Sequence, residues 1–325
     1  MTETAHGVSS IATAQSQERE PMFSVVIPTF NRAGLLEQAL NSVFAQRFTS
    51  YELIVVDDGS TDSTVHFLRS LELKLTFLTQ PNRGPASARN LGASRARGAY
   101  LAFLDSDDVW FPWTLEVYAR ILRETANPSF LAGRPHPFGA EVPPDVPETN
   151  NLRWNSFTDY LASGDEWRWF GASSFVLARS RFLAIGGFTP QFRAAEDPDL
   201  CLRLGIAPGF VQVIAPATFG YREHTGHISS GARFAVEGAL NLVNAELGGA
   251  YPGGKDRRWE RWRILTRHVR PAAIAGIRNG MIRCGFTLYL NTFIWQLSIG
   301  AWRFVFGFPP LSVFYAIARR VSPKA

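Results

Sequence analysis

Three carboxylates, Asp105, Asp107 and Asp108, directly follow the apolar run from Ala99 to Leu104. Carboxylates at this spacing repel one another unless a cation lies among them. Hard divalent ions such as Mg²⁺ and Mn²⁺ prefer oxygen ligands and are commonly shared with phosphate groups. The cluster therefore predicts a metal that holds a phosphorylated ligand. The alternative is a solvated turn in which Ser106 and Asp107 cap the next helix.

Strands and helices alternate in the segment that must position this cluster. The apolar runs predict strands over residues 23–28, 53–56, 75–78 and 99–104. Between them, apolar residues at helical spacing and capping residues predict helices over 35–44, 64–71 and 86–97. This order is typical of βαβ units, so we expect an α/β fold with a mostly parallel central sheet flanked by helices.

Three polar loops follow the strands of this expected sheet, at Thr29–Arg32, Asp57–Ser60 and Asp105–Asp108. In open α/β sheets, ligands bind outside the carboxyl ends of the strands, so the three loops are expected to meet at one edge. The chain has no G-x-G-x-x-G after the first strand and no G-x-x-x-x-G-K-[ST] motif, which excludes the usual glycine-rich phosphate loops. Phosphate must then be held in another way, and a metal would hold it.

Composition excludes several classes of protein. With 325 residues, 46% of them hydrophobic, the chain can bury a large core and is not disordered. Only two cysteines, Cys201 and Cys284, are present, so a disulfide framework or a cysteine metal site cannot form. Residues 1–21 lack the apolar segment of a signal peptide and are expected to be a disordered tail on a cytosolic chain.

The second half of the chain is less regular. Residues 135–147 contain five prolines and are expected to form a loop or a subdomain junction. Residues 173–178 and 210–214 are expected to be strands. Glu196–Leu204 is expected to be a helix, because acidic residues in its first turn favour a helix amino end.

The end of the chain is first basic and then apolar. Residues 255–283 carry nine Lys or Arg against two acidic residues, and residues 284–302 and 304–318 carry no charged side chain. This order favours an anionic membrane surface over nucleic acid as the partner. We expect an in-plane amphipathic anchor or a re-entrant hairpin, and the alternatives are a buried helix pair or a dimer interface.

Four segments together resemble glycosyltransferase family 2, the inverting transferases of GT-A fold. They are SVVIPTFNR from Ser24, ELIVVDDGSTDST from Glu52, NRGPASARNLGASRARG from Asn82 and YLAFLDSDDVW from Tyr100. The resemblance covers about residues 22–230. It implies a GT-A domain over 22–235, with a nucleotide-sugar half at 22–112 and an acceptor half at 113–235. Residues 236–325 are then a helical, membrane-associating region.

Position by position, the resemblance implies two groups of donor-binding residues. Those at the nucleoside pocket are Pro28, Thr29 and Asn31, with Asp58 accepting from the base and Asp57 supporting its loop. The second group lies near the phosphates. Arg89 and Asn90 would reach toward the base or a phosphate. The metal, Mg²⁺ or Mn²⁺, would be held by Asp105, Asp107 and Asp108, and His224 would approach the metal or the diphosphate. His227 is the near alternative to His224.

The segment FTPQFRAAEDPDLCLR from Phe188 resembles the part of the family that supplies the base. The resemblance implies that Asp197, with Glu196 beside it, takes the proton of the acceptor hydroxyl. The alternative is that both residues merely favour a helix amino end. Two features depart from the family pattern: Pro198, and the aromatic residues Trp167, Trp169 and Phe170, which either pack in the core or stack on an acceptor.

The resemblance as a whole implies a metal-dependent inverting glycosyltransferase. It would move a sugar from a nucleoside diphosphate, UDP, to a hydroxyl of a saccharide or lipid-linked acceptor at the inner face of the cell membrane. The rivals are a nucleotide-sugar-binding protein with altered catalysis and a nucleotidyltransferase on a similar fold. The second would need a glycine-rich basic loop after the first strand, which Thr29–Arg32 does not supply.

Overall fold

A mixed β-sheet forms the first two thirds of the protein, in a computed structural model that describes residues 20–71, 75–139, 146, 148, 151–164, 171–192, 194–223 and 231–321. The strand order of this sheet is β3-β2-β1-β4-β9-β6-β10-β8. Its strands are β1 (Phe23–Thr29), β2 (Tyr51–Asp57), β3 (Thr76–Thr79), β4 (Tyr100–Phe103), β6 (Phe130–Ala132), β8 (Arg153–Phe157), β9 (Phe175–Ala178) and β10 (Phe210–Ala215).

The four strands expected from the apolar runs are neighbours and run parallel. Strand β1 pairs with β2 and β4, and β2 pairs with β3, all in parallel. Strand β9 is antiparallel to β4 and β6, and β8 is antiparallel to β10, so the second half of the sheet is mixed. The parallel register brings the ends of β1, β2 and β4 to one edge, as the sequence predicts.

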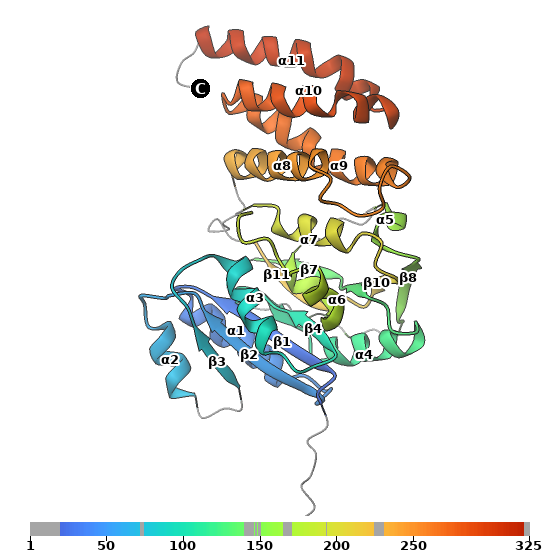
Figure 1. Cartoon of the computed structure of the whole chain (residues 1–325). Helices are drawn as coiled ribbons and strands as arrows, with labels where there is room; N and C mark the ends of the chain where they lie inside the picture. Colours follow the sequence, from blue (N-terminus) through green and yellow to red (C-terminus); the bar gives the residue numbers. More distant parts are fainter. Residues whose placement is uncertain are drawn as a thin grey trace, which may run out of the picture.

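Helices cover both faces of the sheet (Figure 1). They are α1 (Ala33–Phe44), α2 (Thr64–Ser70), α3 (Pro85–Arg95), α4 (Thr114–Glu124), α5 (Tyr160–Ser163), α6 (Arg179–Ala184) and α7 (Glu196–Leu204), with a 3₁₀ turn at Ala172–Ser174. Successive residues of β1 join different cores: Val25 and Ile27 pack with α1 and α4, while Val26 packs with α3. A side chain at Gly92 would meet Val26 at 2.5 Å, so glycine allows α3 to lie close to the sheet.

One segment expected to be a loop contains a strand. Strand β7 (Pro135–Phe138) belongs to a small second sheet of order β5-β11-β7, with β5 (Val109–Trp110) and β11 (Phe219–Arg222). Two prolines are tolerated in β7 because it is an edge strand, where a missing N–H breaks fewer ladder hydrogen bonds. The expectation of a loop over 135–147 was therefore wrong for its first four residues.

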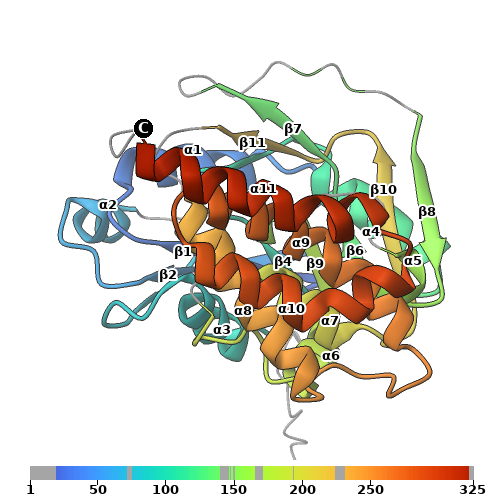
Figure 2. The same cartoon turned by 90° about the horizontal axis from the view of Figure 1, so that it is seen from above.

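Four helices follow the sheet: α8 (Ala232–Leu247), α9 (Arg258–Arg278), α10 (Ile282–Ser298) and α11 (Trp302–Val321). They stack in layers above α7, with α10 and α11 side by side in the outermost layer (Figures 1 and 2). The apolar core under α3 and α7 continues into α8, α9, α10 and α11 without interruption. A side chain at Gly238 in α8 would meet the Ala195 side chain at 2.9 Å, so α8 packs directly on the residue before α7.

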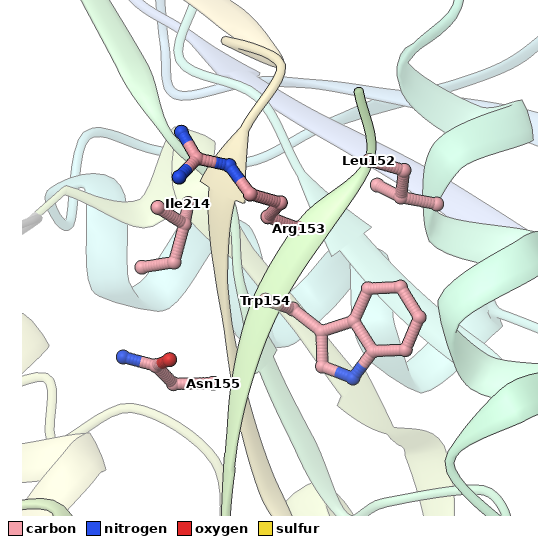
Figure 3. A pocket seen from close by; sticks show the side chains of 5 residues that line it. All are labelled: Leu152, Arg153, Trp154, Asn155 and Ile214. Atoms are coloured by element: carbon pink, nitrogen blue, oxygen red, sulfur yellow. The ribbon is translucent and has the colours of Figure 1, made fainter. Parts of the chain in front are cut away.

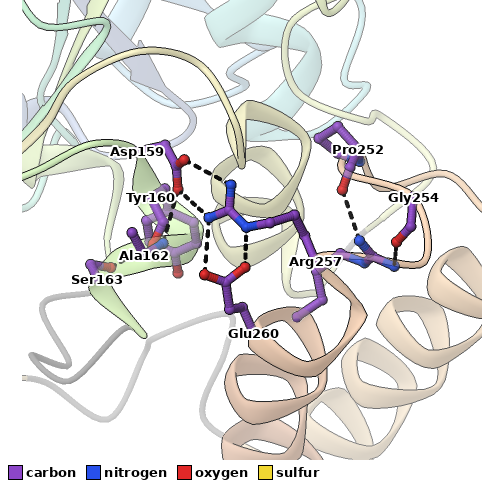
Figure 4. Close-up of polar contacts among 9 residues, drawn as sticks. Asp159, Tyr160, Ala162, Ser163, Pro252, Gly254, Arg257 and Glu260 are labelled. Carbon is purple, nitrogen blue, oxygen red and sulfur yellow. Dashed lines mark hydrogen bonds and ion pairs between the residues drawn. The ribbon is translucent and has the colours of Figure 1, made fainter.

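Ion pairs attach the start of α9 to the rest of the protein (Figure 4). Both terminal nitrogens of Arg257 donate to the carboxylate of Asp159, at 2.8 and 3.0 Å, and Arg257 also contacts Glu260. Arg261, which is buried, donates to the carboxylate of Glu246 at 2.7 Å and to two backbone carbonyls. Helices α8 and α9 are therefore fixed to each other and to the segment before α5.

The last two helices each have a buried and an exposed side. In α10, Leu288 and Trp295 are buried while Leu290 and Ile294 are about two thirds exposed. The exposed side of α11 consists of Trp302, Arg303, Phe306, Pro310, Val313, Phe314 and Ile317. None of the helices in the described part of the chain is both long enough and apolar enough to cross a membrane.

Candidate active site

The loops after β1 and β2 are held together by Asn31. Its backbone adopts a left-handed conformation, and its N–H donates to the hydroxyl of Ser60 at 2.8 Å. Its side-chain oxygen accepts from the backbone N–H of Thr61 at 2.7 Å and from that of Asp62. The amide oxygen of Asn31, expected at the nucleoside pocket, thus serves mainly to join these two loops.

The two buried carboxylates after β2 are bonded mainly to backbone N–H groups. Asp57 accepts from Gly59 and Ser60 and so holds its own loop in place. Asp58 accepts from the side chain of Gln80 at 2.6 Å and from the backbone N–H groups of residues 83 and 84 at 2.9 and 2.8 Å. Since a carboxylate has about four acceptor positions, Asp58 keeps one for a ligand.

The end of β1 holds a buried hydroxyl, that of Thr29. Pro28 lies in β1 opposite Val56, and the next residue, Thr29, is buried. The hydroxyl of Thr29 has no hydrogen-bond partner among the residues that the structure describes. A buried hydroxyl without a partner is costly, so a ligand that bonds to it would recover that free energy.

Asp105 and Asp107 each bind an arginine from a different element. Asp105 contacts the guanidinium of Arg89 at 2.6 Å, and Asp107 contacts that of Arg32 at 2.6 Å. The side chain of Asp105 is 27% exposed and that of Asp107 8% exposed. The loop after β4 therefore joins the loop after β1, as the sheet topology predicts.

Asp108 points into the protein instead. Its carboxyl accepts from the hydroxyl of Ser173 at 2.6 Å and from the backbone N–H of Arg222 at 3.0 Å. Burial raises the pKa of Asp108, and the charges of Asp105 and Asp107 raise it further. With both oxygens bonded inside, Asp108 is the least suited of the three to bind a metal.

Arg89, expected near the base or the phosphates, contacts two carboxylates of the site. It is 4% exposed and bridges Asp105 to Glu196, whose oxygen lies 3.6 Å from the guanidinium. Burial lowers its pKa, but the charges of Asp105, Asp197 and Glu196 outweigh this effect and raise it. Arg89 therefore partly neutralises these side chains.

Asn90, also expected near the base or the phosphates, is bonded to the backbone. Its side-chain N–H donates to the backbone carbonyl of Phe188 at 2.8 Å, and its oxygen accepts from the N–H of the same residue at 2.9 Å. Both polar ends of the amide are therefore bonded to one peptide segment. Asn90 joins α3 to the turn after Gly187, and this turn leads toward α7.

Asp197 and Glu196 lie in the first turn of α7, as predicted. Burial and the charge of Glu196 raise the pKa of Asp197 to about 8, against the opposing effect of Arg89. Burial likewise raises the pKa of Glu196. One oxygen of Asp197 is buried without a hydrogen-bond partner in the part of the chain that is described. A carboxyl with these properties is suited to accept a proton near neutral pH.

The cluster combines acidic and basic side chains. Its five carboxyl groups, those of Asp105, Asp107, Asp108, Glu196 and Asp197, lie near the guanidinium groups of Arg32, Arg89 and Arg222. Burial raises the pKa of Asp108, Glu196 and Asp197, so Asp105 and Asp107 are the members that offer charged oxygens to a cation. No three acidic, His or Cys side chains within the described ranges converge as a metal group. One or two carboxylates with substrate phosphates suffice for Mg²⁺, so the donor set fits.

Some predicted residues cannot be placed. His224, its alternative His227 and the aromatic residues Trp167, Trp169 and Phe170 lie outside the described residues. Pro198, the departure on the acceptor side, is buried in the first turn of α7.

Sequence reasoning missed three residues that hold the carboxylates, namely Arg32, Ser173 and Arg222. The side chain of Arg222 is 1% exposed, donates to the backbone carbonyl of Asp107 at 2.7 Å and to Gln38 at 2.7 Å, and lies over the ring of Phe138. Arg32 stands inside the first motif quoted above, so it could have been proposed as a partner of the acidic loop. Arg222 lies outside the quoted motifs. Nothing in the sequence singles out Ser173.

A cavity of about 390 Å³ lies elsewhere, at the outer edge of the sheet (Figure 3). It is lined by residues of the two strands at this edge, namely Arg153, Trp154 and Asn155 of β8, Leu152 directly before β8, and Ile214 of β10. None of the residues expected to take part in chemistry lines it.

The arrangement of these loops agrees with a comparison to known families. Residues 24–188 match the model of glycosyl transferase family 2. The chain belongs to this family. The match ends at Phe188, so it includes the three loops at the edge of the sheet but not α7.

Curated relatives of this family 2 glycosyltransferase match over parts of their length. Validoxylamine A glucosyltransferase of Streptomyces hygroscopicus subsp. jinggangensis is 32% identical over 247 residues, which cover 65% of this chain and 58% of that protein. An uncharacterised glycosyltransferase of Rickettsia bellii is 38% identical over 108 residues, which cover 33% of this chain and 16% of that protein.

Solved structures show that the family 2 chain has the GT-A fold. Staphylococcus aureus TarS (residues 1–349), solved with UDP-GlcNAc, has a TM-score of 0.60 at 22% identity and matches over 79% of this chain and 75% of that one. The mannosyltransferase PcManGT of Pyrobaculum calidifontis, solved with GDP-Man and Mn²⁺, has a TM-score of 0.52 at 17% identity, over 95% and 89%.

Proposed function

We propose that the protein is a metal-dependent inverting glycosyltransferase that moves a sugar from UDP to an acceptor hydroxyl. The observation that carries this proposal is Asp197, a buried carboxyl with an unpartnered oxygen and a raised pKa, close to an acidic cluster at the carboxyl edge of the sheet. A uridine donor is proposed because TarS, a structural neighbour, was solved with UDP-GlcNAc.

The donor is proposed to bind where β1 and β2 end. Asp58 has one acceptor position left for an N–H of the base, and the hydroxyl of Thr29 has no partner within the described ranges. Asp57 and Asn31 keep the two loops in this conformation by bonding to backbone N–H groups. The nucleoside therefore meets a site whose polar atoms are already oriented.

Asp107 and Asp105 are the residues proposed to hold Mg²⁺ or Mn²⁺, because they are the more exposed members of the acidic loop. When bound, the metal would stabilise the negative charge of the leaving diphosphate. Arg32 and Arg89 neutralise the same carboxylates, so the loop is stable before the donor arrives. His224 is proposed as a further ligand or diphosphate contact.

Asp197 is proposed to act as the general base. It takes the proton of the acceptor hydroxyl while the acceptor oxygen bonds to the anomeric carbon and the bond from that carbon to the diphosphate breaks. The diphosphate leaves with the bonding electron pair, so no covalent enzyme intermediate forms and the anomeric configuration inverts. Glu196, beside the base and paired with Arg89, sets its electrostatic surroundings.

A saccharide or lipid-linked acceptor at the inner face of the cell membrane is proposed, for assembly of polysaccharide or glycolipid. The support is the exposed apolar side of α10 and α11, where Phe306 and Ile294 are 71% and 67% exposed. Helices with one such side bind in the plane of a membrane surface.

The transferase proposal is tested by turnover of a panel of nucleotide sugars with Mn²⁺, with Mg²⁺ and with a chelator. We expect hydrolysis or transfer of one UDP-sugar that depends on the metal. Asp107→Ala should raise the metal concentration needed, and Asp197→Asn should abolish turnover while leaving UDP binding intact. If no donor is turned over or bound in the presence of metal, the proposal fails.

A further inference from the structure

A basic cavity lies between α9 and the turn that joins α10 to α11. It has a volume of about 220 Å³ and is lined by Trp259, Arg263, Arg267 and Arg270 of α9 and by residues 299–301 of the turn. A water molecule occupies about 30 Å³, so the cavity has room for roughly seven waters or for a phosphoryl group with its ester substituents. It lies outside the set of residues assigned to the transferase site.

The three arginines of this cavity lie on one side of α9, because residues 263, 267 and 270 are one and two helical turns apart. Like charges at this spacing destabilise a helix. An anion bound in the cavity would reduce the repulsion among these charges. Trp259 adds an aromatic wall, with the guanidinium of Arg263 at 5.9 Å from its ring centre.

One side-chain nitrogen of Arg267 is the second observation that indicates a bound anion. Its Nη1 atom is buried and has no hydrogen-bond partner in the described part of the protein. A buried N–H of a charged group without an acceptor is costly. An oxygen of a phosphoryl group is the acceptor that guanidinium groups bind most readily, through paired N–H donors.

The cavity adjoins the exposed apolar side of the last two helices. Residues 299–301 form its wall, and Trp302, 55% exposed, comes directly after them. Figure 2 shows α10 and α11 side by side in the outermost layer. Basic and aromatic residues next to an apolar helix side are the arrangement that binds the headgroup region of an anionic bilayer.

We propose that this cavity binds the phosphate of an anionic membrane lipid, while the exposed side of α10 and α11 enters the boundary of the acyl chains. The inference rests on the membrane association proposed above and identifies where a headgroup is held. It is independent of the transfer reaction, since the cavity shares no residue with the acidic cluster.

The test is binding of the full-length protein to vesicles of phosphatidylcholine mixed with phosphatidylglycerol, measured by co-sedimentation. The variant Arg267→Gln/Arg270→Gln should bind about thirty-fold more weakly than the wild type, because each basic residue at such a surface contributes roughly fivefold. The matched control is Arg69→Gln/Arg123→Gln, which removes two exposed arginines from α2 and α4. It should bind like the wild type.

Folding is checked by the melting temperature of each variant. The variant Arg267→Lys/Arg270→Lys keeps both charges, so it should retain most of the vesicle binding even if the glutamine variant is unstable. Equal binding by the glutamine variant and the wild type would overturn the cavity proposal alone. Failure of the wild type to bind vesicles would overturn membrane association as well, and neither result would bear on sugar transfer.

Two further outcomes would contradict the proposal. If inorganic pyrophosphate, with no divalent metal, raises the melting temperature of the wild type but not of the glutamine variant, while vesicle binding is unchanged, the site takes a free anion. If the wild type sediments as a dimer that Phe306→Ser disrupts, and does not bind vesicles, a second copy covers the apolar side. The expected result is a monomer whose vesicle binding falls in Phe306→Ser.

Discussion

The carboxylates after β2 and those after β4 are held in different ways. Asp57 and Asp58 accept hydrogen bonds mainly from backbone N–H groups of their own and neighbouring loops. Asp105 and Asp107 instead contact the guanidinium groups of Arg89, which is buried, and Arg32, which is partly exposed. We expect the proposed nucleoside end of the site to be rigid before the donor binds, while the proposed metal end has in Arg32 a partner that a cation can replace.

The largest effect is expected at Asp197. Replacing it by Asn should lower kcat by about a thousandfold, because a positioned general base contributes on the order of 10²–10⁴. The measurement is the rate of transfer at saturating donor and metal. UDP affinity should not change, because Asp197 lies outside both groups of donor-binding carboxylates. A variant that keeps more than a tenth of the activity would remove Asp197 from the mechanism.

The rigid end is tested by Asp58→Asn. The substitution places an amide N–H opposite the backbone donors of residues 83 and 84, so we expect the free energy of unfolding to fall by about 3 kcal/mol. Urea denaturation measures it. Asp256→Asn, an exposed carboxylate before α9, is the matched control and should change stability little. Equal loss in both variants would mean that Asp58 is not specially held.

Activity should depend on pH through Asp197. Its pKa is raised to about 8, so the free enzyme is mostly protonated there at neutral pH, and kcat/KM should rise about tenfold per pH unit until pH 8 and then level off. The measurement is kcat/KM as a function of pH at a saturating concentration of the metal. A flat profile between pH 6 and about 8 would contradict it.

Stability should have the opposite dependence on pH. The folded protein keeps a proton on Asp197 that the unfolded chain releases at its ordinary pKa, so the free energy of unfolding falls as pH rises toward 8. Asp197→Asn should flatten this part of the stability curve. If the variant and the wild type have the same pH dependence, the carboxyl is not buried as described.

The smallest effect is expected at the exchangeable end. Arg32→Gln removes the partner of Asp107, so Mn²⁺ should bind between about two- and fivefold more tightly, the range of a partly exposed ion pair. Calorimetric titration with Mn²⁺ in the absence of donor measures this. Weaker binding would show that Arg32 supports the metal site and does not compete with it.

The sheet edge could be predicted from the sequence because it depends on regular patterns. Continuous apolar runs predict β1, β2 and β4, and parallel strands bring their following loops together. Helix α7 was predicted with its observed bounds, Glu196–Leu204, since its acidic first turn and apolar positions are both local features.

The partners of charged side chains could not be predicted in this way. Arg89 is bonded to Asp105, and Asn90 is bonded to the backbone of Phe188, which is 98 residues away. Strand β7 was missed because proline is unfavourable in most strands, and only its position at a sheet edge makes it tolerable. Such contacts depend on tertiary structure and leave no local pattern.

The contact between α8 and Ala195 determines when, during synthesis, the turn before α7 gains its packing partner. Ala195 adopts a left-handed backbone conformation, unfavourable for a residue other than glycine, and the turn leads directly into Glu196 and Asp197. Its cover, α8, emerges from the ribosome roughly forty residues later, and α9 to α11 follow. At on the order of 5–20 residues per second, the turn before α7 is synthesised several seconds before the helix that covers it. During synthesis this turn is therefore without the support that holds its left-handed residue in the folded protein.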